Sequence, residues 1–240
     1  MAELSFFVGI IGNMISVLMF LSPVDTFWRI IKKRSTEDFS SVPYICTLLN
    51  TCLWTYYGLM KPGEYLVATV NAFGVLLQTI YITIFLIYAP KHKRVHAIVG
   101  VILDLVMSGA VAAVTQLALE GVNRINAVGL MGAAFNILMY GSPLTAMKTV
   151  VMRRSVEYMP FLLSFFFFLN GAVWFLYAFL LRDPILGVPN GAGFILGSVQ
   201  LVLYGIYKGA KSSNGNKNIV DDQQSLNENL IISSSPQSHV

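Results

Sequence analysis

The chain has 240 residues, of which 55% are hydrophobic and only 12% are charged. A soluble globular domain carries roughly 25% charged residues, so this composition excludes an ordinary soluble protein and favours one embedded in a lipid bilayer. The formal net charge is +4. The basic residues lie in alternate connections between apolar segments, a pattern that indicates membrane topology and not binding to nucleic acid.

Seven apolar segments are long enough to cross a bilayer, which takes roughly 20 residues in a helix. Six contain no charged residue, and the fourth contains one acid, Asp104. In chain order they cover residues 4–24, 39–60, 65–90, 97–119, 125–147, 158–181 and 184–207. Because the segments are continuously apolar and do not alternate with polar residues, they predict helices and not the strands of a membrane barrel.

The first three and the last three segments are two copies of one unit. Asn50 and Asn170 are 120 residues apart, as are Trp54 and Trp174 and the two Ser-Pro pairs at 22–23 and 142–143. Three is an odd number, so a linker helix must cross the membrane if both copies are to run in the same direction. The predicted fold class is therefore an all-α membrane protein with seven transmembrane helices, arranged as two parallel three-helix repeats joined by a linker helix (3+1+3).

This organisation predicts four regions. The first repeat covers residues 5–89, the linker helix 97–119 and the second repeat 126–207. Residues 208–240 are rich in Ser, Asn and Gln and predict a disordered cytoplasmic tail. Thirteen basic residues lie in the tail and in the connections after the first, third and fifth helices, against three on the opposite side. The excess predicts a cytoplasmic C-terminus and a lumenal or extracellular N-terminus.

Several motifs resemble those of the plant SWEET sugar transporters, over roughly residues 5–207. They include Pro23-x-x-Thr26-Phe27, Tyr57-Gly58, Val70-Asn71, Tyr140-Gly141-Ser142-Pro143 and Val188-Pro189-Asn190-Gly191. The resemblance implies the 3+1+3 fold and facilitative transport of mono- or disaccharides. The Tyr56-Tyr57-Gly58 motif and the Pro62-Gly63-Glu64-Tyr65 loop are similar to the subgroup of the vacuolar membrane, for which fructose and glucose are the expected cargo.

Four residues in the repeats predict a sugar-binding layer. Asn71 and Asn190 are matched amides, each with two hydrogen-bond donors and an acceptor suited to sugar hydroxyls. Trp54 and Trp174 are matched aromatic plates for the C–H face of a sugar ring. Each lies six or seven residues from the same end of its helix, about 10 Å deep at 1.5 Å per residue. The alternatives are hydrogen bonding between helices for the asparagines, which suits Asn50 and Asn170 better, and an interfacial belt for the tryptophans.

Four prolines fall at corresponding places in helices 1, 2, 5 and 6: Pro23, Pro43, Pro143 and Pro160. Proline deletes a backbone hydrogen bond and kinks a helix, so the set predicts hinges. Pro43 and Pro160 also suit an ordinary helix start. By the resemblance, the prolines take part in an inward–outward rocking motion.

The resemblance also implies two gates. Tyr57 and Asp183 would form the outer gate, with Lys61 as a partner of Asp183. Met159 and Phe161 would form the inner constriction.

The sequence as a whole predicts a bidirectional hexose uniporter that works by alternating access, in the vacuolar membrane and not the plasma membrane. Its partners are a monosaccharide and the lipid bilayer, and a homo-oligomer is compatible with the sequence. Neither a nucleotide motif nor a set of catalytic or metal-binding residues is evident, so no cofactor, no metal and no enzymatic activity are expected. The alternatives are a seven-helix signalling receptor, against which the repeat argues, and a PQ-loop carrier of another small solute.

Overall fold

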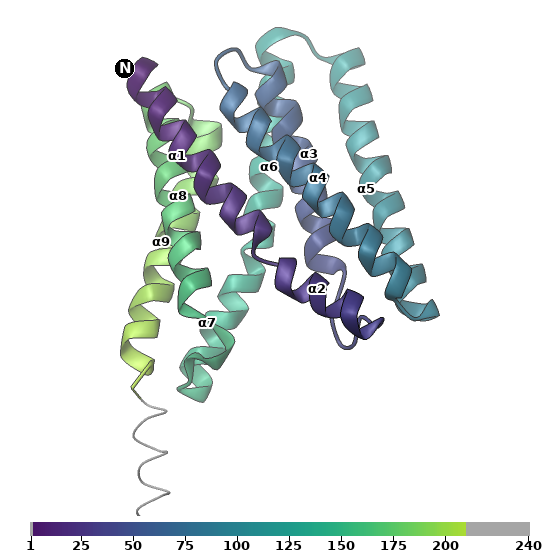
Figure 1. The fold of residues 1–240 in the computed structure, drawn as a ribbon. Coiled ribbons are helices and arrows are strands. Elements are labelled where there is room, and N and C mark those ends of the chain that lie inside the picture. The colour runs from purple at the N-terminus through teal and green to yellow at the C-terminus, as the bar shows by residue number, and fades with distance from the viewer. Residues whose placement is uncertain (1, 210–240) are drawn as a thin grey trace, which may run out of the picture.

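In the computed structural model, which describes residues 2–209, the chain forms helices and their connections with no strand in that range (Figure 1). The first repeat contains α1 (Ala2–Leu21), α2 (Val24–Lys33), α3 (Val42–Met60) and α4 (Tyr65–Tyr88). The linker is α5 (Lys91–Ala118). The second repeat contains α6 (Gly121–Met139), α7 (Gly141–Arg153), the short 3-10 helix η1 (Val156–Tyr158), α8 (Phe161–Leu181) and α9 (Pro184–Tyr207). The predicted tail lies almost entirely outside the described residues.

Six helical stretches are long and apolar enough to cross a membrane, when α1 is joined to α2 and α6 to α7. The remaining helix, α3, has 19 residues, or about 28 Å at 1.5 Å per residue. It is more polar than the others because it contains Asn50 and three threonines. The predicted all-α fold with seven membrane-length helices is confirmed.

The first helix of each repeat is broken in the middle, at α1–α2 and at α6–α7. Pro23 and Pro143 lack the N–H that would bond the carbonyls of Met19 and Met139, four residues earlier. At the first break, Ser22 donates its N–H to the Met19 carbonyl instead, at 3.2 Å. The two prolines therefore stand where the backbone hydrogen bonding of the long helices is interrupted.

The other two prolines occupy helix starts. Pro43 is in the first turn of α3, and Pro160 immediately precedes α8.

The linker helix begins at Lys91, before the apolar segment at 97–119, because a basic turn can be helical without being apolar. For the same reason α6 begins at Gly121, ahead of residue 126.

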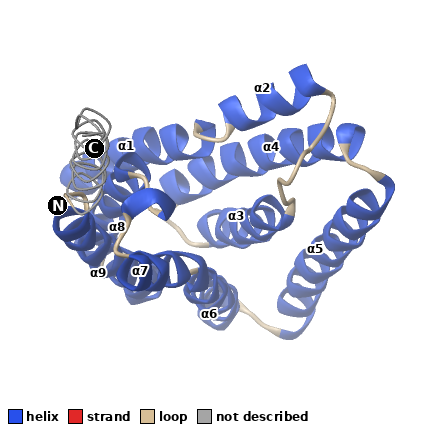
Figure 2. Ribbon diagram, turned by 90° about the horizontal axis from the view of Figure 1, so that it is seen from below, coloured by secondary structure: helices blue, strands red, loops and turns tan. Residues whose placement is uncertain are grey.

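The two repeats are interlocked through their first helices (Figures 1 and 2). Within each repeat the second and third helices pack together, α3 on α4 and α8 on α9. In addition α1 packs on α8, and α6 packs on α3, so each first helix contacts the other repeat. The linker α5 lies outside, mainly against α3.

Glycines permit this close crossing. A Cβ at Gly9 of α1 would lie 2.7 Å from the ring of Tyr177, and a Cβ at Gly129 of α6 would lie 2.5 Å from the ring of Tyr57. Gly9 and Gly129 are 120 residues apart. The same contact is thus made twice, once on each side of the interface between the repeats.

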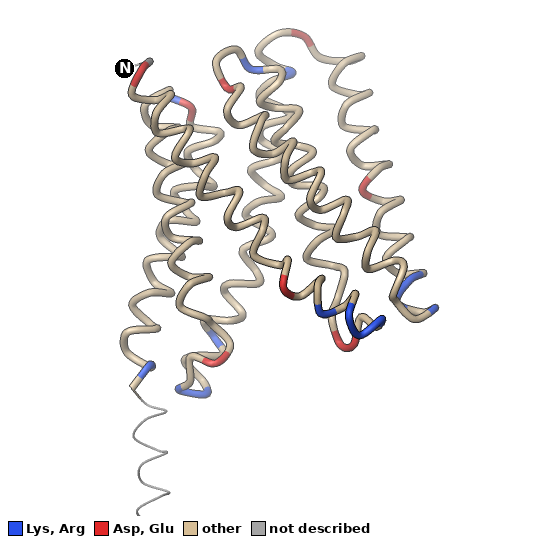
Figure 3. Tube along the Cα trace, in the orientation of Figure 1, with Lys and Arg blue, Asp and Glu red and all other residues tan. Residues whose placement is uncertain are grey.

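The charged residues distinguish the two ends of the bundle (Figure 3). Most Lys and Arg residues gather at the end that contains α2, the start of α5 and the last turn of α7, which we call the basic end. The opposite end, called the N-terminal end, contains the start of α1 and the connections at 61–64 and 182–183. Towards the basic end the two bundles diverge, with α2 against α4 and α7 against α9 of its own repeat (Figure 1).

The tight contact between α8 and α9 predicts a position-specific loss of stability. A Cβ at Gly171 would lie 2.6 Å from the backbone nitrogen of Phe194, which cannot move independently of α9. We expect Gly171→Ala to destabilise the protein by about 1–3 kcal/mol through overpacking and to lower its thermal unfolding midpoint in detergent. Gly205→Ala is the matched control, because nothing lies within 4 Å of that Cβ. An unchanged midpoint for Gly171→Ala would contradict the observed approach of the two helices.

Candidate functional site

A central cavity of about 180 Å³ lies between the two repeats. Helices α1, α3 and α4 line it from the first repeat and α6, α8 and α9 from the second. Its polar lining consists of Ser16, Thr47, Asn50, Thr51, Trp54, Asn71, Asn136, Tyr140, Asn170, Trp174 and Asn190. The structure therefore brings together the four residues of the predicted binding layer.

The two predicted amides have the same geometry in both repeats. Asn71 donates one amide N–H to the carbonyl of Val67 at 2.8 Å, and Asn190 donates one to the carbonyl of Leu186, also at 2.8 Å. Each bond stays within its own helix and orients the side chain. The second N–H and the carbonyl oxygen of each amide make no other hydrogen bond within residues 2–209. Neither asparagine therefore links two helices, and both have capacity left for a ligand.

The two tryptophans are buried, with 4% of Trp54 and 5% of Trp174 exposed. Each indole packs on a glycine of the other repeat: a Cβ at Gly132 would lie 3.4 Å from Trp54, and one at Gly12 would lie 3.0 Å from Trp174. An interfacial belt residue faces the lipid headgroups. Burial between the repeats is incompatible with that alternative.

The indole N–H groups differ between the two repeats. Trp174 donates to the Ser16 hydroxyl at 2.9 Å, and Ser16 donates to the Asn170 side-chain oxygen at 2.6 Å. Asn170 therefore bridges α1 and α8 in addition to lining the cavity. Trp54 has no acceptor within residues 2–209, and the side-chain oxygen of Asn50 is buried without a partner. These two unpaired groups, the Trp54 N–H and the Asn50 oxygen, belong to the first repeat and are available to a polar ligand.

The polar cavity residues that were not predicted from the sequence include Ser16, Asn136 and Tyr140. Tyr140 donates to the carbonyl of Pro189 at 2.6 Å and accepts from the Asn136 amide at 3.1 Å. A Cβ at Gly193 would lie 2.7 Å from the Tyr140 hydroxyl, so this glycine leaves room for the contact. Ser16 and Asn136 are 120 residues apart. The repeat offset that paired the tryptophans could therefore have identified this position as well.

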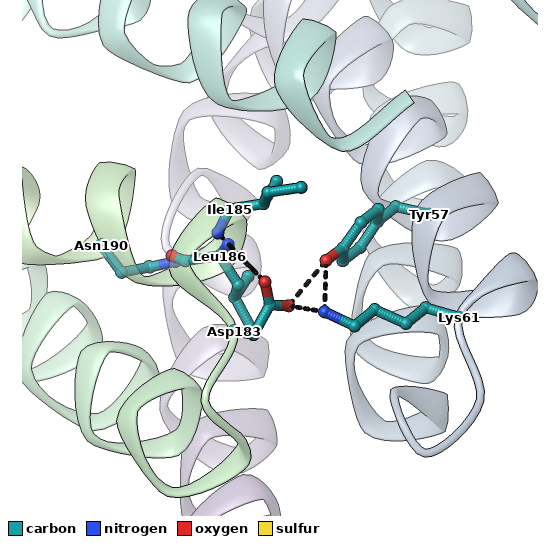
Figure 4. Close-up of polar contacts among 6 residues, drawn as sticks. All are labelled: Tyr57, Lys61, Asp183, Ile185, Leu186 and Asn190. Atoms are coloured by element: carbon teal, nitrogen blue, oxygen red, sulfur yellow. Dashed lines mark hydrogen bonds and ion pairs between the residues drawn. The ribbon is translucent and has the colours of Figure 1, made fainter. Parts of the chain in front are cut away.

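A polar cluster of Tyr57, Lys61 and Asp183 joins the repeats near the N-terminal end (Figure 4). Tyr57 donates its hydroxyl to Oδ2 of Asp183 at 2.6 Å, and the Lys61 ammonium lies 2.7 Å from the same oxygen. Lys61 also donates to the Tyr57 hydroxyl at 2.8 Å. The other oxygen of Asp183 caps α9 by accepting from the N–H groups of Ile185 and Leu186. The two residues that were expected at an outer gate therefore meet, and they link the first repeat to the second.

A second buried acid, Glu64, lies next to this cluster. It occupies the N-cap position of α4, as Asp183 does in α9, and the two acids are 119 residues apart, like Asn71 and Asn190. Burial, followed by the charge of Asp183, raises the pKa of Glu64 from 4.5 to about 7, against an opposing effect of Lys61. Burial also acts to raise the pKa of Asp183, but hydrogen bonds from Lys61 and Tyr57 outweigh it and hold that pKa below its ordinary value.

The residues expected at the inner constriction lie within the second repeat. Met159 is buried against Met147 and Val150. Phe161 is 45% exposed and stacks on Phe165, with ring centroids 5.8 Å apart. Within residues 2–209, neither residue has a ring or core contact with the first repeat, and their role as a gate stays a prediction.

Comparisons with known proteins follow the same division into repeats. A family described as "Sugar efflux transporter for intercellular exchange" matches residues 6–93 and 126–212. The chain belongs to this SWEET family. Its members are membrane sugar transporters and not enzymes, so the predicted family is confirmed and a signalling receptor is excluded.

Individual relatives match over nearly the whole chain. The bidirectional sugar transporter SWEET17 of Arabidopsis thaliana is 56% identical over 229 residues, which cover 93% of this chain and 95% of the relative. SWEET16 of the same plant is 53% identical, covering 94% and 96%. A solved structure of a eukaryotic SWEET transporter superposes with a TM-score of 0.84 at 40% identity, covering 87% of this chain and 98% of the other.

The Glu64–Asp183 pair predicts a pH dependence of stability. A raised pKa means that the protonated form of Glu64 is favoured in the folded, closed state, so its contribution is complete below about pH 4.5 and is lost as the pH rises through about 7. Asp183 acts in the opposite sense and loses its contribution only as the pH falls below 3.8. We therefore expect the thermal unfolding midpoint to be higher at pH 5.5 than at pH 8.

Glu64→Gln should abolish this difference, because the amide cannot titrate. Glu120→Gln, at an exposed position of the same end, should retain it. An equal pH dependence in both variants would show that Glu64 is not the titrating group.

Proposed function

We propose that the protein is a facilitative, bidirectional uniporter that carries a hexose, fructose or glucose, down its concentration gradient. One observation carries the proposal: a single cavity holds one amide and one indole from each repeat at equivalent positions. An amide can donate a hydrogen bond to a sugar hydroxyl or accept one from it. The face of an indole can contact the C–H face of a sugar ring. Four such groups around one cavity match the chemistry of an uncharged sugar.

The contacts at the two ends support transport by alternating access. The cluster of Tyr57, Lys61 and Asp183 seals the N-terminal end, whereas the bundles diverge towards the basic end. If this cluster breaks while the basic ends of the two repeats approach each other, the same cavity becomes open at the N-terminal end instead of the basic end. The broken helices at Pro23 and Pro143 are the proposed hinges, together with the helix starts at Pro43 and Pro160. Met159 and Phe161 would then meet the first repeat.

The location of the charges supports uniport without ion coupling. In the described part of the chain, residues 2–209, no charged side chain lines the central cavity. Glu64 and Asp183 lie beyond its N-terminal end, and Asp104 is buried on the linker helix, which does not line the cavity. An ion that drives transport would have to bind near the sugar or to a group that moves with it.

We place the protein in the vacuolar membrane, with the basic end in the cytoplasm. The excess of Lys and Arg at that end supports the orientation. The motif Tyr56-Tyr57-Gly58 and the loop at 62–65 support the membrane assignment, through their similarity to the vacuolar subgroup. Assembly into a homo-oligomer stays a prediction.

The first test of the site is substitution of the matched amides. We expect Asn71→Ala and Asn190→Ala each to reduce uptake of labelled fructose into proteoliposomes by roughly 5- to 150-fold, because each removes hydrogen bonds to the sugar worth about 1–3 kcal/mol. Asn126→Ala is the control, since Asn126 is exposed on α6 outside the cavity. Normal uptake by both cavity variants would refute the binding site.

The second test concerns sugar size. Two buried indoles, each able to cover about 150–250 Å², restrict the cavity, so hexoses should be carried well and sucrose poorly or not at all. Trp54→Ser should admit sucrose and weaken fructose transport through loss of stacking. Competition of unlabelled sucrose with labelled fructose measures both effects. Rapid sucrose flux through the unmodified protein would overturn the steric argument.

A further inference from the structure

A second cavity of about 260 Å³ opens towards the basic end, beside the second repeat. Its wall is formed by α7, η1, α8 and α9, with Met19 of α1 as the contribution of the first repeat. Met19 and Phe167 line both this cavity and the central one. The two cavities are therefore adjacent and share a wall of two side chains.

The first repeat fills the corresponding space with aromatic rings. Phe27 and Tyr81 stack with centroids 4.4 Å apart, and Tyr44 packs edge-on against Phe27 at 4.8 Å. Tyr81 also donates its hydroxyl to the carbonyl of Phe20 at 2.9 Å. This aromatic cluster packs α2, α3 and α4 together.

In the second repeat the equivalent positions carry smaller or more flexible side chains. By the 120-residue offset that relates Asn50 to Asn170 in the second helices, Tyr44 corresponds to Ser164, although Pro43 and Pro160 at the starts of these helices are 117 residues apart. By the 119-residue offset of the third helices, Tyr81 corresponds to Gln200. Ser164 and Gln200 both line the second cavity. Two positions that carry rings in the first repeat thus carry polar side chains in the second, and both of these side chains line the second cavity.

These two polar side chains lack partners. Ser164 is 1% exposed and Gln200 is 6% exposed, yet neither side chain makes a hydrogen bond within residues 2–209. A buried polar group without a partner costs about 1–3 kcal/mol, so a polar occupant of the cavity would offset that cost. Tyr158 and Ser142 are exposed at the rim, where they add two hydroxyl groups.

We propose that this cavity is a second monosaccharide site, formed by the second repeat alone, which the sugar occupies between the central cavity and the basic end. The amide of Gln200 and the hydroxyl of Ser164 bind sugar hydroxyls, and Phe167 and Met159 contact the apolar face of the ring. On the basic side of the central cavity, the sugar therefore passes along the second repeat only, although the protein is built from two repeats. This inference rests on the proposed sugar transport.

A cysteine reporter distinguishes the second site from the central one. Ala146 on α7 lines the second cavity, so Ala146→Cys should react with a small charged thiol reagent added to the purified protein in detergent. The labelling rate of the introduced thiol is measured by mass spectrometry, which separates it from the native Cys46 and Cys52. The experiment is carried out in the Asn71→Ala/Asn190→Ala background, where the central site is disabled. Fructose should slow labelling about twofold when its concentration equals the Kd of the second site.

The matched variants are Ser164→Ala/Gln200→Leu, which removes the polar wall, and Gln200→Tyr, which introduces the side chain of the first repeat. Both should abolish protection by fructose while retaining a single symmetric peak in size-exclusion chromatography. Tyr81→Phe in the first repeat should leave protection intact.

Protection that disappears in the Asn71→Ala/Asn190→Ala background would show that only the central site binds sugar and would overturn the proposal. Equal protection by mannitol, or protection that survives loss of the polar wall, would also overturn it. The proposed transport function is judged separately, by fructose uptake of the unmodified protein, so its failure is distinguishable from failure of the second site.

Discussion

The close crossing of each repeat's first helix over the second helix of the other repeat is the contact on which the site depends. Gly9 and Gly12 on α1 accommodate the rings of Tyr177 and Trp174, and Gly129 and Gly132 on α6 accommodate those of Tyr57 and Trp54. Any side chain at Gly9 or Gly129 would overlap a tyrosine ring. Because both halves of the interface use the same contact, the two tryptophans and the two asparagines face one cavity instead of two separate ones.

Within the bilayer, nearly every polar side chain around the cavity is satisfied in a way that also positions it. Asn71 and Asn190 use a carbonyl four residues earlier in their own helices, and Ser16 connects Trp174 with Asn170 across the repeats. Hydrocarbon offers no water to compete for these groups. The polar groups around the cavity that remain without a partner, such as the side-chain oxygen of Asn50, are available to a sugar.

The two ends of the transport path are held by different forces. At the N-terminal end, an ion pair between Lys61 and the buried Asp183 joins the repeats, and Asp183 also caps α9. At the basic end each repeat is held by its own apolar contacts, through the Phe27–Tyr81 stack in the first and the Met147–Met159 cluster in the second. An ion pair between the two repeats, such as Lys61–Asp183, can separate when the repeats move apart, which suits the proposed gate. Apolar clusters internal to each repeat suit bundles that move as units.

The sequence by itself determined the spans, the duplication, the family and the pairing of Asn71 with Asn190 and of Trp54 with Trp174. Hydropathy and a constant repeat offset are properties of the linear chain, and equivalent positions in parallel repeats reach the same depth whatever the details of packing. The residues of the outer cluster were expected from the family resemblance. Their meeting required the structure, because Tyr57 and Asp183 come together only through the crossing of the two repeats.

Other features were decided by tertiary structure alone. The sequence assigned no separate role to Glu64 of the loop at 62–65, and only the structure shows its burial beside Asp183, which raises its pKa. The places where α1–α2 and α6–α7 break, and the placement of Pro43 and Pro160 at helix starts, follow from local backbone bonding that hydropathy does not detect. The unequal cavities likewise depend on whether three aromatic rings can pack in the same space, which is a property of side-chain volumes in three dimensions and not of the repeat pattern.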